Sequence, residues 1–191
     1  MTELTEGVVY SGSFNPLHNG HLEIIKLLSK AFEVVYVVVT VQNPTKSFGM
    51  ENYTERLNNV KNIIEKSGLT NVFVEDIETT IDPPYYTIKT LDALSLKYPM
   101  TLLSLCVGGD CLETFDKWYQ WETILGSYGV VAIPRKGYNT GPAIENLKAK
   151  GEEPEYWHLT VLNAEVPDIS STEIRNKIKN SEDVSHLIPT L

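Results

Sequence analysis

The chain has 191 residues, of which 42% are hydrophobic and 21% are charged, and its net charge is −9 at pH 7. This length and composition suit a single α/β domain over residues 1–191, and they exclude a disordered or fibrous protein. The negative charge argues against a general nucleic-acid surface. Because no apolar run could span a membrane and no basic, apolar leader opens the sequence, we expect a cytoplasmic protein.

The stretch VVYSGSFNPLHNGHL, residues 8–22, is the most informative part of the chain. Its apolar start predicts a strand, and Gly12 and Ser13 predict a tight turn where backbone N–H groups can face a phosphate. Asn15 or Asn19 can cap the amphipathic helix that the following apolar spacing predicts.

His18 and His21 flank the N-terminus of this predicted helix. Partial positive charge and unpaired N–H groups at such an end favour an anion, and two imidazoles three positions apart can both reach one phosphoryl group. The alternative interpretation is structural, with His18 capping a loop and His21 packing within the helix.

Strands and helices are predicted to alternate along the rest of the chain. The β-branched run at residues 33–40 is typical of a central parallel strand that is covered on both faces. The helix predicted from Tyr53 carries Arg56, which we expect at the surface. Further strands are predicted over residues 72–75, 102–107, 128–133 and 157–162, with helices starting near Thr87 and Ala143. This pattern predicts a Rossmann-like, doubly wound parallel sheet with helices on both faces.

Asp110 and two tryptophans follow the predicted strand at residues 102–107. Ligands in open α/β sheets collect at the carboxyl ends of the strands, which makes Asp110 a candidate site residue. Trp118 is a candidate for stacking on a ligand ring at this edge, and Trp121 is assigned to the core. Because the two tryptophans are three positions apart, they could instead form one apolar helical face.

Several other polar residues allow more than one interpretation. Arg135 and Lys136 follow the strand predicted to end at residue 133, and they could face phosphate or lie in a solvated turn. Cys106 and Cys111 match no zinc spacing or redox pair, so we predict no protein-bound metal.

The stretch DISSTEIR, residues 168–175, is the second motif. Taken alone it predicts a capping box, with Ser170 as N-cap and Glu173 three residues later. Arg175, however, lies in the early turns of the predicted helix, where the dipole disfavours a cation. An anion shared by Arg175 and the helix amides removes this conflict. The hydroxyls that would complete such a phosphate cradle belong to Ser171 and Thr172.

These motifs resemble those of a known superfamily. GSFNPLHNGH, residues 12–21, resembles the GSFxPxHxGH signature of the nucleotidylyltransferases, in the form found in nicotinate or nicotinamide mononucleotide adenylyltransferases. ISSTEIR resembles their ISSTxxR. Weaker matches are Y-T-x-x-T-L at residues 86–91, G-x-D ending at Asp110 and F-x-x-W at residues 115–118. The chain departs from the bacterial nicotinate type at residues 43–46, where NPTK replaces a Pro-Pro-His-Lys-like segment.

The resemblance implies a nucleotidylyltransferase fold and adenylyl transfer from ATP to nicotinate mononucleotide, with nicotinamide mononucleotide as a second acceptor to test. Mg²⁺ would be carried by ATP. The implied catalytic residues are His18, His21 and Arg175. The implied ATP or phosphate contacts are Gly12, Ser13, Phe14, Lys46, Ser171 and Thr172. The implied mononucleotide contacts are Tyr86, Thr87, Asp110 and Trp118.

Several alternatives stay open at the level of sequence. Lys46 could be an ordinary solvated lysine, and Thr87 and Thr90 could be ordinary early-helix residues. The acceptor could be another phosphorylated compound, such as phosphopantetheine or riboflavin phosphate. The chain could also be a catalytically silent nucleotide-binding module. The sequence is compatible with a homo-oligomer and does not define one.

Overall fold

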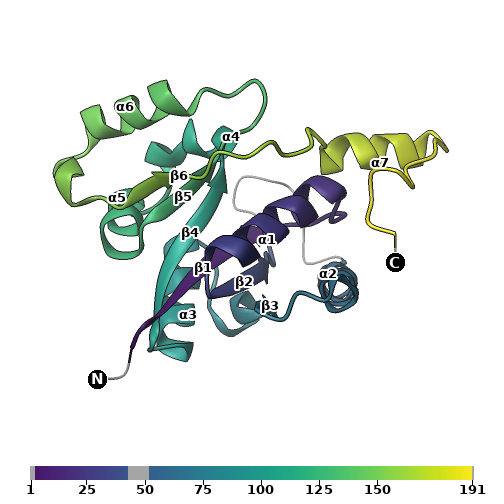
Figure 1. Cartoon of the computed structure of the whole chain (residues 1–191), viewed down its shortest axis with the longest axis horizontal. Helices are drawn as coiled ribbons and strands as arrows, with labels where there is room; N and C mark the ends of the chain where they lie inside the picture. Colours follow the sequence, from purple (N-terminus) through teal and green to yellow (C-terminus); the bar gives the residue numbers. More distant parts are fainter. Residues whose placement is uncertain (1–2, 43–51, 191) are drawn as a thin grey trace.

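The fold is built on one parallel sheet (Figure 1). A computed structural model of the chain describes residues 3–42 and 52–190, and within these residues six strands pair in the order β3-β2-β1-β4-β5-β6. Every pairing is parallel. The strands are β1 (Thr5–Gly12), β2 (Val34–Val39), β3 (Val72–Glu75), β4 (Thr101–Gly108), β5 (Val130–Ile133) and β6 (Leu159–Val161). From β1 the chain adds β2 and β3 on one side and then β4, β5 and β6 on the other. The order of the strands therefore reverses between β1 and β4, and such sheets open a ligand crevice at this point.

Helices cover both faces of the sheet, as the sequence predicts. The longer helices are α1 (Asn19–Ala31), α2 (Tyr53–Ser67), α3 (Thr87–Lys97), α6 (Thr140–Lys150) and α7 (Ser171–Lys179). The shorter ones are η1 (Ile77–Thr80), α4 (Gly109–Leu112), η2 (Phe115–Lys117), α5 (Trp121–Thr123), η3 (Ile124–Tyr128) and η4 (Pro154–Tyr156). Helices α1 and α2 pack on one face, and α3 and α6 pack on the other.

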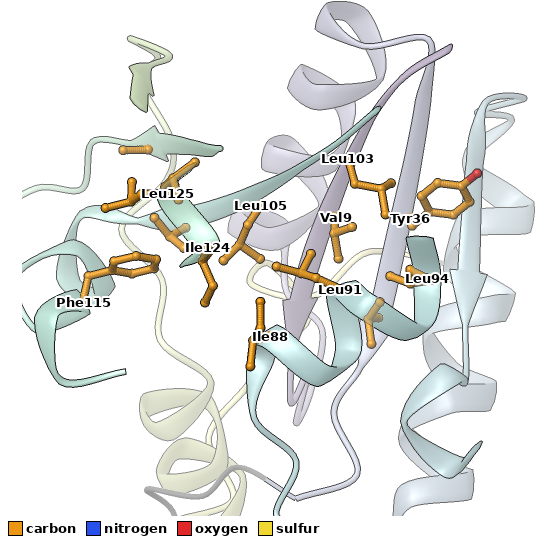
Figure 2. Close-up of a cluster of buried hydrophobic side chains, with 14 of the residues drawn as sticks. Val9, Tyr36, Ile88, Leu91, Leu94, Leu103, Leu105, Phe115, Ile124 and Leu125 are labelled. Atoms are coloured by element: carbon orange, nitrogen blue, oxygen red, sulfur yellow. The ribbon is translucent and has the colours of Figure 1, made fainter. Parts of the chain in front are cut away.

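Two apolar clusters hold these layers together, one on each face of the sheet. Along β2 every residue is buried, and even-numbered residues face the α3 side while odd-numbered ones face α1 and α2. Figure 2 shows Leu91 of α3 pointing at Val9 and Leu105 of the strands. The strand predicted at residues 33–40 is therefore confirmed as a strand that is covered on both faces, and it is one residue shorter at each end, Val34–Val39.

Several predicted boundaries are wrong. Helix α6 begins at Thr140 rather than near Ala143. Strand β5 begins at Val130 rather than at residue 128, because residues Ile124–Tyr128 wind into a π-helical turn and Gly129 then adopts a φ of +85°. That left-handed value suits glycine and ends the turn. The strand predicted over residues 157–162 contracts to β6. Among the described residues, no helix is both long enough and apolar enough to cross a bilayer.

Candidate active site

A cavity of about 270 Å³ opens at the carboxyl ends of β1, β4 and β5. The N-terminal turns of α1 and α7 close its other sides, with His18 and Ser171 among the lining residues. Its position is the crevice that a reversal of strand order creates. The two sequence motifs, at opposite ends of the chain, therefore meet in one place.

Most of the predicted site residues lie in the wall of this cavity. Those that do are Gly12, Ser13, Phe14, His18, His21, Asp110, Trp118, Ser171, Thr172 and Arg175. Tyr86 and Thr87 lie outside that lining, and the Tyr86 ring instead stacks on Tyr119 with their ring centres 4.6 Å apart. Lys46 is outside the described residues.

His18 and His21 form a reciprocal cap at the start of α1. The backbone N–H of His21 donates to Nδ1 of His18 at 3.3 Å, and the backbone N–H of His18 donates to Nδ1 of His21 at 3.3 Å. The N-cap is thus His18, and the prediction of Asn15 or Asn19 as the cap is wrong. Because each Nδ1 accepts a hydrogen bond, a neutral ring at either position carries its proton on Nε2.

The two imidazole rings also stack, with their centres 3.6 Å apart. A ring held both by a cap and by stacking keeps one orientation, which is what a donor to a phosphoryl group requires. The capping interpretation and the phosphate interpretation are compatible, because capping uses Nδ1, while the proton of a neutral ring is on Nε2 at the other side of the ring.

Burial, together with the positive charge of Arg135, lowers the pKa of His18 from 6.5 to about 4. The unfolded chain therefore binds more protons than the folded protein between these two pH values. The stability that His18 contributes is complete above about pH 6.5 and is lost as the pH falls toward 4. The free energy of unfolding should fall by about 2 kcal/mol for this reason, once solvent screening is allowed for.

In urea unfolding from pH 7 to 4, the free energy of unfolding of His18→Asn should fall by about 2 kcal/mol less than that of the wild type. Parallel curves would contradict the assignment.

The helix N-terminus offers fewer N–H groups to a ligand than predicted. The backbone N–H of Asn19 donates to the carbonyl of Leu187 at 2.9 Å, and its side-chain amide donates to the carbonyl of His186 at 3.0 Å. The N–H of His21 is already used by the cap. The prediction of unpaired amides is therefore wrong for these two residues, because the C-terminal segment folds back over Asn19 and the His18 ring caps His21.

The ring of Phe14 has a structural place, and the phosphate contact predicted for this residue is through its backbone amide. Its ring is buried and lies 3.1 Å from the point where a Cβ on Gly12 would sit. The glycine therefore makes room for this ring. The ring packs edge-on against His21, with centres 5.1 Å apart. The side chain of Phe14 supports a catalytic candidate, and only its backbone can face a ligand.

The second motif is hydrogen-bonded to the first. Arg175 donates to the carbonyl of Asn15 at 2.6 Å and to the hydroxyl of Thr172 at 3.0 Å, and the hydroxyl of Ser171 donates to the carbonyl of Pro16 at 3.0 Å. Ser170 is the N-cap of α7 but makes no side-chain cap bond, so the predicted capping box does not form. These contacts fix α7 beside the histidines.

Arg135 is a site residue that the sequence left undecided. It is half-buried in the cavity wall, donates to a carboxylate oxygen of Asp110 at 3.1 Å and lies 3.6 Å from a carboxylate oxygen of Asp168. The neighbouring Lys136 is exposed. Between its two carboxylates, Arg135 is a positive charge held in one place at the carboxyl end of β5.

The prediction that Arg56 lies at the surface is wrong. Arg56 is only 7% exposed, and its guanidinium donates to the carbonyls of Ser13 and Thr40 at 2.6 and 3.0 Å. The signal was its place between Tyr53 and Leu57 on the inner face of α2, both of which are buried.

The two tryptophans lie on different elements and do not form one helical face. Trp118 follows η2, lines the cavity and packs on Phe115 with ring centres 4.9 Å apart. Trp121 begins α5 and packs against the core and Trp157, as assigned. In the described parts of the chain, no group of three or more His, Cys, Asp or Glu is placed to hold a metal ion.

A parallel sheet of this order, with an HxGH motif and an ISSTxxR motif in one cavity, defines a nucleotidylyltransferase. The family model for cytidylyltransferase-like proteins matches residues 9–177, and the chain belongs to this family.

Similar proteins carry one activity in their names. The "Probable nicotinate-nucleotide adenylyltransferase" of Flavobacterium johnsoniae is 33% identical over 95% of this chain and 90% of that protein. Its namesake from Bacteroides fragilis is 32% identical over 96% of this chain and 87% of that protein. The solved Plasmodium falciparum nicotinic acid mononucleotide adenylyltransferase complexed with NaAD has a TM-score of 0.77 at 19% identity, over 96% of this chain and 90% of that one. That structural likeness confirms the fold.

Proposed function

We propose that the protein transfers the adenylyl group of ATP to nicotinate mononucleotide, releasing pyrophosphate and forming the dinucleotide of NAD biosynthesis, in the cytoplasm. The observation that carries this proposal is the meeting of His18, His21 and Arg175 in one cavity. The names of the relatives support the same reaction.

The reaction needs charge neutralisation more than it needs a base. The 5′-phosphate of the acceptor is already anionic at neutral pH, so it can attack the α-phosphate of ATP in line while pyrophosphate leaves. The protein must place the two phosphates and stabilise the charge on the transferring group. The Nε2–H groups of His18 and His21 are assigned to the α-phosphate, beside backbone amides of residues 12–14.

The departing phosphates are assigned to the second motif. Arg175 carries the charge, and the hydroxyls of Ser171 and Thr172 lie beside it in the cavity wall. Lys46 is proposed as a further phosphate contact. Mg²⁺ arrives with ATP, since this ion prefers phosphate oxygens and water to a dedicated protein cage.

The acceptor is assigned to the Trp118 side of the cavity. The ring of Trp118 can stack on the cationic pyridine ring, and Asp110 lies in the same wall. Tyr86 is the N-cap of α3 and makes no side-chain cap bond. The N–H of Lys89 already donates to the carbonyl of Tyr86 at 2.9 Å, so the N–H groups of Thr87 and Ile88 at the start of α3 are assigned to the pyridine carboxylate.

We expect kcat/KM for nicotinate mononucleotide to exceed that for nicotinamide mononucleotide by at least about tenfold, because donors built for a carboxylate are poorly paired by an amide. The experiment supplies ATP and Mg²⁺ with each acceptor and measures pyrophosphate. Phosphopantetheine and riboflavin phosphate serve as the competing acceptors. A ratio near one would contradict carboxylate selectivity, and turnover with none of the four would leave the silent module as the better interpretation.

A further inference from the structure

The buried guanidinium of Arg56 joins three segments that meet beneath the cavity. Its Nη1 donates to the carbonyl of Ser13 at 2.6 Å and to that of Thr40 at 3.0 Å, and its Nη2 donates to the carbonyl of Val41 at 3.4 Å. Ser13 belongs to the turn after β1, and the other two residues follow β2. Arginine suits this place because its planar fork presents five N–H donors in fixed directions, whereas the three donors of lysine sit on one compact ammonium at the end of a flexible stem.

The contact with Ser13 sets the direction of the next amide. In a trans peptide unit the C=O and the N–H point to opposite sides. Arg56 is absent from the cavity lining, whereas Ser13 and Phe14 are part of it. The Ser13 carbonyl points at Arg56, which lies outside the cavity lining. The N–H of Phe14, on the opposite side of the same peptide unit, therefore points toward the cavity.

The backbone at Phe14 needs such support. Its φ is +44°, in the left-handed region that non-glycine residues seldom adopt. Conformations of this kind persist where the surroundings hold them, and they gather at ligand sites. Arg56 donates a hydrogen bond to the carbonyl of the peptide unit immediately before this residue.

Glu78 completes the network from the other side. It is 3% exposed, accepts the backbone N–H of Val41 at 2.7 Å and accepts the hydroxyl of Thr90 at 3.1 Å. Its negative charge also lies close enough to attract that of Arg56. The buried cation is thus compensated, as a buried charge must be. Since Thr90 is in α3, the network reaches the element assigned to the acceptor.

We propose that Arg56 is a positioning residue that holds the Ser13–Phe14 peptide with its N–H directed at the α-phosphate of ATP. The proposal rests on the adenylyl-transfer function. Arg56 is buried outside the cavity lining, so it acts through the backbone and not by contact with a substrate. Because the amide acts on the transferring phosphate, loss of its orientation should lower kcat more than it raises KM.

The test compares R56K and R56M with K61M, which removes an exposed cation from the same helix. We expect kcat to fall by about tenfold in R56K and at least about thirtyfold in R56M, with KM for ATP within about threefold and K61M like the wild type. Thermal unfolding identifies any variant that fails to fold, and R56K then decides. Wild-type kcat in a folded R56K, or a rise in KM alone, would overturn the proposal.

A second measurement does not depend on turnover. In ¹⁵N-labelled protein, α,β-methylene ATP should shift the Phe14 amide resonance of the wild type and of K61M, and should leave it nearly unmoved in R56K. An equal shift in R56K would overturn the inference about Arg56. If the wild type makes no dinucleotide yet its Phe14 amide responds, the proposed acceptor fails while the role of Arg56 stands.

Discussion

His18→Ala and His21→Ala should each lower kcat by at least about a hundredfold, since each removes one Nε2–H donor from the transferring phosphate. The reciprocal cap fixes which nitrogen carries the proton in both rings. Stacking at 3.6 Å fixes their planes. A donor held this firmly does not have to be reoriented during the reaction. Steady-state kinetics with ATP and nicotinate mononucleotide measure the loss.

The cap itself must be separated from catalysis. Alanine at position 18 removes the Nδ1 acceptor of the His21 N–H and should cost about 1 kcal/mol of stability. Asparagine is a good N-cap, so His18→Asn should keep the fold and still lose turnover like the alanine variant. Near-wild-type turnover in His18→Asn would mean that His18 serves only as a cap.

Much of the fold can be predicted from local patterns, because burial follows the periods of strand and helix. Every residue of the β-branched β2 is buried, and on α3 the residues spaced for one face, Ile88, Leu91 and Leu94, all enter the core. The boundary of β5 could not be predicted, because the π-helical turn before it depends on packing against distant segments. For example, the N–H of His158 donates to the carbonyl of Leu125 in that turn.

The candidate site is predicted where motifs are local and missed where contacts are distant. The residues around His18 and Arg175 follow from short patterns, and the structure places both in one cavity. The partners of Arg56 are backbone carbonyls, one of them 43 positions away, and every residue supplies such a carbonyl. No pattern of residue types encodes that contact. The cap by His18 was missed for a related reason, since cap preferences favour Asn, Asp, Ser and Thr over histidine.

Arg175→Ala should lower kcat/KM for ATP by about a hundredfold, and it should weaken ATP binding more than mononucleotide binding. Two losses combine in this variant. The positive charge assigned to the departing phosphates disappears, and a charged hydrogen bond to an anion is among the strongest polar contacts in proteins. The 2.6 Å bond to the carbonyl of Asn15, which ties α7 to the first motif, is also broken.

A matched variant separates these two losses. Ser171→Ala changes no charge, but it removes both a second bond between the motifs, from the Ser171 hydroxyl to the carbonyl of Pro16, and a hydroxyl assigned to the departing phosphates. Its loss of activity is therefore an upper limit on what the bond between the motifs contributes. If charge dominates, Ser171→Ala should lower kcat/KM by only about fivefold, and Arg175→Lys, which keeps the charge without the planar fork, should fall between Ser171→Ala and Arg175→Ala. Calorimetric titrations with α,β-methylene ATP and with nicotinate mononucleotide measure each affinity separately. Should the mononucleotide lose more affinity than the ATP analogue in Arg175→Ala, the two ends of the cavity are assigned the wrong way round, and the second motif binds the acceptor phosphate.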